Sequence, residues 1–142
     1  MAWRFEGRLT VVVHGPKNPS NLEWQSMLRD ETQRGRQERG VTLVVSHGGG
    51  PDGRQRELLG QQIAGKPAPT CIMTASVLVR AITAALLFFN RTMKVVGLDE
   101  TQRAYDFLDL SRDERTAADR VRAELEAELG LGPAVPKAAS DR

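Results

Sequence analysis

The twelve residues from Val41 to Asp52 constrain the fold of this chain more than any other segment. Val41–Val45 is a continuous run of apolar and β-branched residues, which is typical of a strand buried on both faces. Ser46–Gly50 follows with three consecutive glycines and leads to Asp52, a residue type that favours the start of a helix. A strand that passes through a glycine-rich loop into a helix predicts an α/β domain. In such domains strand ends and helix starts share one working edge.

The residues before this unit predict an antiparallel hairpin followed by a helix. Trp3 and Phe5 alternate with charged residues, and a turn at Gly7 separates them from the apolar run Leu9–Val13. Ser20 and Glu23 then have the spacing of a capping box, so we expect a helix from there to about residue 34.

The residues after it repeat the cycle. Asp52 is expected to cap a helix that ends near Gly65 and Pro67, and residues 69–75 form the next strand. A helix from Ser76 is apolar on most of its surface, which predicts the most buried helix of the fold. Its apolar residues are Val77, Leu78, Ile82, Ala85, Leu86 and Phe89. Residues 93–96 form the last strand, and Asp99 is expected to cap a helix carrying Ala104, Phe107 and Leu108.

These elements predict an α/β fold with a mixed sheet, in which an N-terminal hairpin precedes alternating helices and strands. We expect the α/β domain to span residues 1–110 and a C-terminal amphipathic helix, opened by the capping box Ser111 and Glu114, to span 111–129. Its narrow apolar stripe either docks on the domain or pairs with a second copy. Residues 130–142 are expected to be disordered. Right-handed crossovers would place His14, residues 46–50, 74–76 and 97–99 on one edge.

Composition limits the classes of function. The chain has 142 residues, enough for one domain, and a formal net charge of only +2. The arginines between residues 29 and 39 are therefore interpreted as a solvated helix face, without nucleic-acid binding. A single cysteine, Cys71, excludes an intramolecular disulfide and lies in an apolar run, where we expect it to be buried. The longest apolar stretch, residues 81–89, is roughly half of what a bilayer span needs. We expect a cytoplasmic protein without membrane insertion.

The candidate chemistry at the edge is incomplete. His47–Gly50 resembles an esterase oxyanion loop, but no G-x-S-x-G elbow accompanies it. Ser76 with His14 or His47 would supply a nucleophile and a base, yet no acidic partner is evident, and a helix cap explains Ser76 better. The glycine loop also lacks the lysine and hydroxyl of a phosphate-binding loop, and Asp52 would repel phosphate. We therefore expect no catalytic residue, no metal site and no cofactor.

Arginines at two helix starts provide an electrostatic alternative. Arg54 and Arg56 open one predicted helix, and Arg80 lies in the first turns of the next. Together they would offer a positive rim to an acidic or phosphorylated partner, and ordinary surface salt bridges are the competing interpretation.

The strand and helix order, the length and the loop after the third strand resemble the STAS domain family, whose founding members are bacterial anti-sigma-factor antagonists. The resemblance covers about residues 1–110 and is closest to the divergent bacterial branch sometimes grouped with the lipid-transfer CRAL-TRIO domains. The family's acidic-serine-glycine pattern falls on Ser46, His47 and Gly48, so His47 occupies the phosphoacceptor position and the acidic residue is replaced. The resemblance implies a small regulatory binding module, and this departure argues against the family's phosphorylation switch.

The resulting hypothesis is a non-catalytic regulatory or scaffolding module that binds another protein. Exposed amides and arginines at the helix starts would receive an acidic group of the partner, while packed apolar surface excludes water around it. The expected partner-binding residues are His14, Ser46, His47, Gly48, Gly49, Gly50, Arg54, Ser76 and Arg80. The alternatives are a small-molecule or lipid-binding pocket beneath residues 81–89 and, less favoured, a phosphate or nucleotide site. A homodimer through the C-terminal stripe or the N-terminal edge strand also stays open.

Overall fold

A computed structural model describes residues 1–34, 40–62, 68–81 and 92–132 of this protein. Its centre is a five-stranded sheet in which the strands lie in their sequence order, β1-β2-β3-β4-β5. The strands are β1 (Ala2–Glu6), β2 (Leu9–His14), β3 (Val41–Ser46), β4 (Thr70–Thr74) and β5 (Met93–Val96). β1 runs antiparallel to β2, and the remaining pairs are parallel. The predicted α/β fold with an N-terminal hairpin is confirmed.

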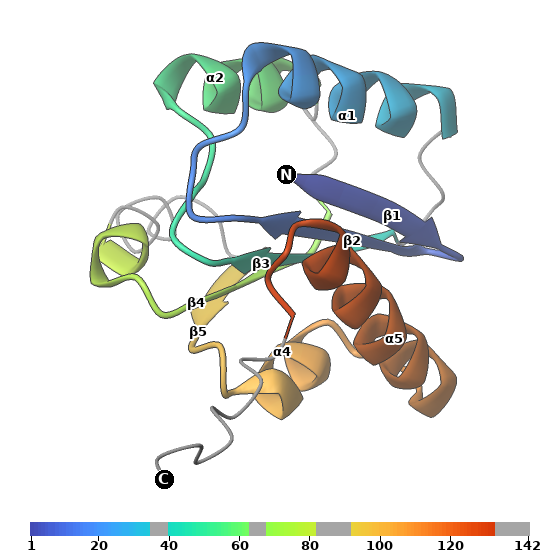
Figure 1. Ribbon diagram of the computed structural model, residues 1–142. Helices are drawn as coiled ribbons and strands as arrows, with labels where there is room; N and C mark the ends of the chain where they lie inside the picture. Colours follow the sequence, from blue (N-terminus) through green and yellow to red (C-terminus); the bar gives the residue numbers. More distant parts are fainter. Residues whose placement is uncertain (35–39, 63–67, 82–91, 133–142) are drawn as a thin grey trace, which may run out of the picture.

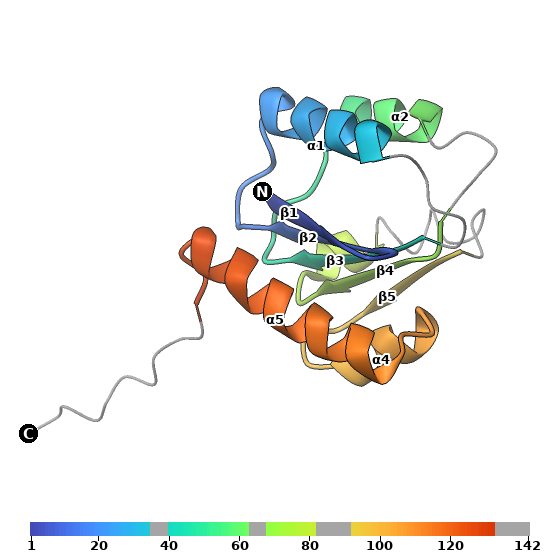
Figure 2. The same ribbon diagram turned by 90° about the vertical axis from the view of Figure 1, so that its right-hand side faces the viewer.

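Helices cover both faces of this sheet (Figures 1 and 2). The upper layer in Figure 1 consists of α1 (Asn21–Arg34) and α2 (Gly53–Gln62). The lower layer consists of α4 (Thr101–Phe107) and α5 (Arg112–Glu128). The sheet is therefore the middle of three layers, and its two faces have separate cores.

Side-chain caps explain where three helices begin. The Ser20 hydroxyl accepts from the Glu23 amide at 3.2 Å, while the Glu23 carboxylate accepts from the Ser20 amide at 2.7 Å. Ser111 and Glu114 form the same reciprocal capping box at α5. At α2, the Asp52 carboxylate accepts from the Gln55 amide at 2.8 Å, as the sequence predicts. These bonds satisfy amides that have no partner within the helix.

The predicted cap at Asp99 is wrong. α4 begins one residue later, with Glu100 at its N-cap position, and no side chain caps it. The Glu100 carboxylate instead accepts from the Gly97 amide at 2.7 Å, so it closes the turn between β5 and the helix. The other predictions for α4 hold, since Ala104 and Leu108 are buried and Phe107 packs on the core.

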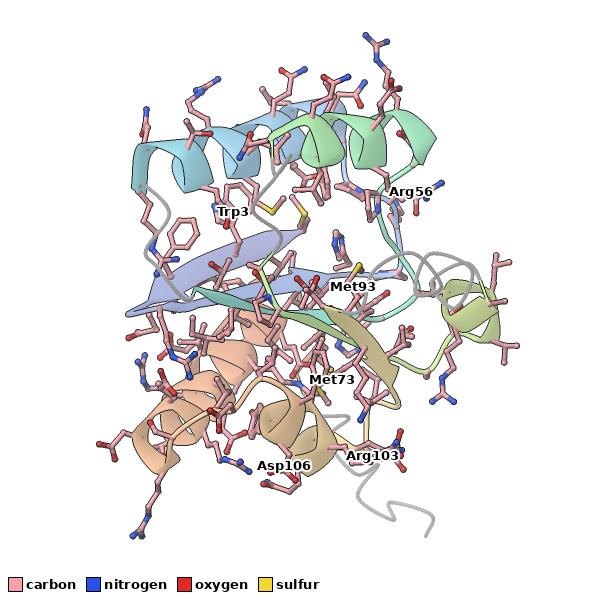
Figure 3. The ribbon with its side chains drawn as sticks, turned by 180° about the vertical axis from the view of Figure 1, so that it is seen from behind. Trp3, Arg56, Met73, Met93, Arg103 and Asp106 are labelled. Carbon is pink, nitrogen blue, oxygen red and sulfur yellow. The ribbon has the colours of Figure 1, made fainter. Side chains whose placement is uncertain are left out.

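The lower core lies between the sheet and the helices α4 and α5. Alternate residues of the strands point into it, because successive side chains of a strand face opposite sides. The strand residues are Leu9, Val11, Val13, Val41, Leu43, Val45, Cys71, Met73 and Val96. They meet Ala104, Tyr105, Leu108, Leu110, Ala118, Val121 and Leu125 from the lower layer. Figure 3 shows Met73 on this side of the sheet, and Cys71 is fully buried, as predicted.

The narrow apolar stripe of α5, for which the sequence allowed either docking on the domain or pairing with a second copy, belongs to this core. Ala118, Val121 and Leu125 are buried against the sheet, so the stripe docks on its own domain and is not available for a second copy. Ion pairs fix the helix to the hairpin, since Arg4 binds Glu124 and Glu128, and Arg8 binds Glu114. The contact between Arg8 Nε and Glu114 Oε1 measures 2.6 Å and lowers the pKa of Glu114 to about 2.

The upper core is smaller among the described residues and includes polar groups. Val12, Trp24, Met27 and Leu28 form its buried part, with Trp3 packed against them. Figure 3 shows Trp3 between β1 and α1, where its indole nitrogen donates to Asp30 at 2.9 Å. The guanidinium of Arg34 lies 4.6 Å from the centre of the Phe5 ring. This arginine of the 29–39 cluster therefore contacts the hairpin, which the solvated-face interpretation did not include.

The helix predicted to be most buried departs from that expectation in its first turn. Residues 77–81 form a helical turn after β4, and Val77 and Leu78 are 80% and 69% exposed. These residues are exposed because the turn lies beyond the end of the sheet, where neither helical layer covers it (Figure 1). The predictions for Ile82–Phe89, including a pocket beneath them, lie outside the described residues, as do those for Ile63, Gly65, Pro67 and residues 133–142.

Candidate functional site

The carboxyl ends of β2, β3 and β4 meet at one edge, which we call the carboxyl edge. The parallel register pairs His14 with Ser46 and Ser46 with Thr74. Gly97 follows β5 at the same edge. The sequence-based expectation that these segments share an edge is confirmed, and the site can be built from them one group at a time.

His14 lies beneath the edge and is not part of an exposed surface. It is 3% exposed, and its ring stacks on Trp24 with 6.4 Å between the ring centres. The pKa of His14 is lowered to about 4, mainly by burial and also by the nearby N-terminal ammonium, against a smaller opposing effect of Glu23. Its Nδ1 atom is buried and has no hydrogen-bond partner among the described residues. The prediction that His14 contacts a partner is therefore wrong.

The backbone amides of the glycine-rich loop, residues 47–50, all have hydrogen-bond acceptors within the protein. The amides of His47 and Gly49 donate to the carbonyl oxygens of His14 and Gly15 at 2.9 and 2.8 Å. Those of Gly48 and Gly50 donate to the side chains of Ser46 and Asn18, both at 3.2 Å. These four amides are therefore not free to bind an anion, and the expected mechanism of acid capture by this loop is wrong.

Gly49 shows that the loop is tightly packed against its neighbour. A Cβ atom at this position would overlap the carbonyl oxygens of Gly15 and Lys17. Gly48 has a φ of 118°, a conformation that side-chain-bearing residues rarely adopt. Ser46 is buried, and its hydroxyl donates to the Gly49 carbonyl oxygen at 2.6 Å. Ser46, Gly48 and Gly49 therefore shape the loop and do not present a binding group.

His47 has an acidic partner that the sequence did not reveal. Its Nε2 atom lies 2.9 Å from Glu126 Oε1, and the same oxygen accepts from Arg122 Nε at 3.0 Å. The side chains are only 24%, 15% and 18% exposed, respectively. Arg122 and Glu126 are spaced as an i, i+4 pair, but nothing local indicates that α5 returns to the end of β3. The contacts among His47, Arg122 and Glu126 hold the last turns of α5 against the glycine-rich loop.

Ser76 and Arg80 lie at the outer part of the edge. The Ser76 hydroxyl accepts from the Val79 amide at 3.2 Å, which confirms it as a helix cap. Arg80 is exposed, and its guanidinium donates to the Thr74 carbonyl oxygen at 3.4 Å. Together with Val77 and Leu78, Arg80 makes the 77–81 turn the exposed apolar and cationic part of the carboxyl edge.

Arg54 lies away from this turn, in the upper layer. It lines a hollow of about 110 Å³ with Asn21, Trp24, Gln25, Gln55 and Leu58. The side-chain Nε2 of Gln55 donates to the Pro19 carbonyl oxygen and to Asn21 Oδ1, both at 3.0 Å, so Gln55 joins the starts of α1 and α2. Arg56 donates to the Pro51 carbonyl oxygen at 2.9 Å. The expected rim of Arg54, Arg56 and Arg80 is therefore divided between two elements with separate contacts.

The described residues bring together few groups that could carry out chemistry. His47 and Glu126 have the geometry of a base and its orienting acid, but the hydroxyls of Ser46 and Ser76 are engaged in local turns. Within the described ranges, no three histidine, cysteine or acidic side chains gather as ligands for a metal ion. In the same part of the chain, no helix combines the length and apolar character needed to cross a membrane.

Comparison of the chain with protein-family models, with curated proteins and with solved structures finds no match.

Proposed function

We propose that this protein is a non-catalytic protein-interaction module that resembles the STAS domains and binds its partner through the 77–81 turn. The observation that carries the proposal is the exposure of Val77 and Leu78, two adjacent large apolar side chains, at the carboxyl edge. Exposed apolar residues that are grouped, and that lie beside a charge such as Arg80, are typical of recognition surfaces.

The position of this turn supports the proposal. It directly follows β4, and in α/β sheets ligands and partners are bound beyond the carboxyl ends of the parallel strands. In Figure 3 the side chains of the turn project away from the three layers, so a partner reaches them without any rearrangement of the core. Among the described residues, nothing covers the apolar side chains of Val77 and Leu78.

The remaining edge residues have a supporting role in this proposal. Gly49 locks the loop of residues 46–50 to residues 15–17, and His47 is held by Glu126. Ser46 is paired with Thr74 in the sheet, so this rigid loop lies beside the end of the strand that leads into the turn. The proposed binding residues are Val77, Leu78 and Arg80.

The family resemblance gains support from the order of the elements. An N-terminal antiparallel hairpin followed by parallel strands in sequence order is the arrangement that the resemblance implies. A regulatory role follows from that resemblance, and a cytoplasmic location follows from the sequence composition; both belong to the same proposal.

The test compares the double variant Val77→Ser, Leu78→Ser with a matched control, Leu22→Ser. Leu22 is 73% exposed but lies on α1, in the upper layer. Affinity capture from native lysate should recover a partner with the wild type and with the control, but not with the double variant. All three proteins should show the same thermal unfolding, because the replaced side chains are exposed. Equal recovery of that partner by all three would contradict the proposal.

A further inference from the structure

We infer that the Nδ1 atom of His47 is a phosphoryl-acceptor site of this protein. The inference concerns the glycine-rich loop and uses no residue of the 77–81 turn, so it can fail while the proposed function stands. It starts from the pairing of His47 with Glu126, which have the geometry of a nucleophile and its orienting acid. Because the hydroxyl of the adjacent Ser46 is bonded to Gly49, the imidazole itself is the group that can react.

The contact with Glu126 decides which nitrogen of His47 can react. Glu126 Oε1 accepts from Arg122 Nε at 3.0 Å, and because an arginine has donors only, this oxygen is an acceptor. The Nε2 atom of His47 lies 2.9 Å from the same oxygen and therefore donates its proton to it. In a neutral imidazole the other nitrogen, Nδ1, then carries the free lone pair. The tautomer that Glu126 selects thus makes Nδ1 the nucleophile.

The Nδ1 atom of His47 is open to solvent. Within the described residues it has no hydrogen-bond partner, and the His47 side chain is partly exposed. In that part of the chain, the one buried side-chain nitrogen or oxygen without a partner is Nδ1 of His14, so Nδ1 of His47 is not buried. The sequence has two histidines, and they differ in just this respect. One ring is oriented and accessible, whereas the other is enclosed against Trp24.

The residues that follow His47 add no side chains that could shield its ring. Gly48, Gly49 and Gly50 come next in the chain, and a Cβ atom at Gly50 would meet nothing within 4 Å. The amides of residues 47–50 are all bonded within the protein, so the loop keeps its shape while the ring reacts. A nucleophile held in place in this way loses little freedom when it meets the donor.

The charges around this loop suit a phosphoryl group. Arg122 shares the Glu126 oxygen with His47, and Lys17 is exposed on the segment whose backbone packs against Gly49. These two cations attract phosphoryl donors, which are anionic. The carboxylate of Glu126 stabilises the positive charge that the imidazole acquires as its bond to phosphorus forms. The donor and the product are therefore each met by a charge of opposite sign.

The donor is of the phosphoramidate class, with its phosphoryl group on nitrogen, as in a phosphorylated histidine of a partner protein. The Nδ1 lone pair of His47 attacks the phosphorus, and a new P–N bond forms as the P–N bond of the donor breaks. The donor, which is protonated beforehand, leaves with that electron pair as a neutral amine or imidazole. The Nε2 proton of His47 stays in its hydrogen bond to Glu126. Atoms and charges balance without any further reactant.

The first experiment uses potassium phosphoramidate as the donor and locates the product by intact-mass spectrometry and NMR. Wild type should gain one phosphoryl group, bonded to Nδ1 of His47. The variant His47→Asn should gain none, whereas His14→Phe should react as wild type does, because the enclosed ring is not the acceptor. Labelling of His14, attachment to Nε2 of His47, or no labelling at all would overturn the inference.

A second experiment distinguishes an activated acceptor from a merely exposed ring. Labelling of His47 in the folded protein should be at least about tenfold faster than in the same chain unfolded by urea, because only the folded chain holds Glu126 on the ring. Glu126→Gln should slow the folded protein by about tenfold, whereas Glu128→Gln, a control on the same helix, should react as wild type does. Equal rates in the folded and unfolded chains, or an unchanged rate in Glu126→Gln, would show an ordinary surface histidine and contradict the inference.

Discussion

The two helical layers enclose the same sheet by different physical means. The lower core is apolar except for the Tyr105 hydroxyl, which donates to Asp119, and ion pairs such as Arg8 with Glu114 close its rim. The upper side includes buried polar groups, among them His14, which has an unpartnered nitrogen, and Gln55, which joins two helix starts. The comparison teaches that packing dominates the stability of the lower side, whereas protonation and hydrogen bonding also matter on the upper side.

The largest expected effect is in the lower core. Leu125→Ala should reduce the free energy of unfolding by about 3 kcal/mol, because Leu125 is 1% exposed and its loss leaves a cavity in the largest cluster. Leu58→Ala in the upper layer should cost about 1 kcal/mol, since Leu58 is only partly buried. Urea unfolding measures both. Equal losses would show that the two sides are packed alike.

The upper side should respond to pH through His14. Burial holds its pKa near 4 in the folded protein, below the ordinary value of 6.5, so protons bind more strongly to the unfolded chain. The contribution of neutral His14 to the free energy of unfolding is fully present above pH 6.5. It falls as the pH drops toward 4, and about 2 kcal/mol of it is lost at pH 5. His14→Phe keeps an aromatic ring on Trp24 and removes this titration. Identical losses between pH 7 and 5 in wild type and His14→Phe, measured by urea unfolding, would contradict the assignment.

A pair of glycine substitutions tests the loop that joins the layers at the carboxyl edge. Gly49→Ala should cost about 2 kcal/mol, because its Cβ would overlap backbone oxygens that cannot move independently. Gly60→Ala in α2 meets open space and should stabilise by up to about 1 kcal/mol through helix propensity. Thermal unfolding should therefore shift in opposite directions. A neutral Gly49→Ala would show that the two loops are not rigidly packed.

The smallest effect is expected where Glu126 of α5 contacts His47 of the glycine-rich loop. Glu126→Ala removes the shared acceptor of His47 and Arg122 and should cost about 1 kcal/mol. Glu126→Gln keeps an oxygen acceptor and should cost less. Hydrogen exchange of the amides in residues 46–50 should become faster in the alanine variant than in the glutamine variant. No change in that loop would indicate that α5 docks without its help.

The sequence predicted the elements whose signals are local. Capping patterns at Ser20, Asp52 and Ser111 placed three helix starts, and the apolar runs placed the strands. The candidate site was predicted less well, because its properties depend on distant segments. Nothing near His47 indicates that Glu126 reaches it, and nothing near Val77 shows that its turn lies beyond the sheet.

The loop amides show the same limit. A run of glycines indicates free backbone donors only if no neighbouring segment accepts from them, and residues 14–18 provide three of the four acceptors. The predicted helix cap at Asp99 was wrong because the next acidic residue, Glu100, occupies the N-cap position and accepts from the Gly97 amide. Hydrogen bonds from a distant segment decided the first case, and a local hydrogen bond between residues three apart decided the second.

The contacts between the hairpin and α5 have a consequence for how the chain reaches this structure. Arg4 and Glu124, which form an ion pair, are separated by 120 residues, and Arg8 and Glu114 by 106. Contacts between residues so far apart in sequence close large loops and slow folding. During synthesis β1 emerges early but must wait for α5 before its lower face is covered. Until then the lower face of that strand is exposed, and chaperone protection of the growing chain is most useful there.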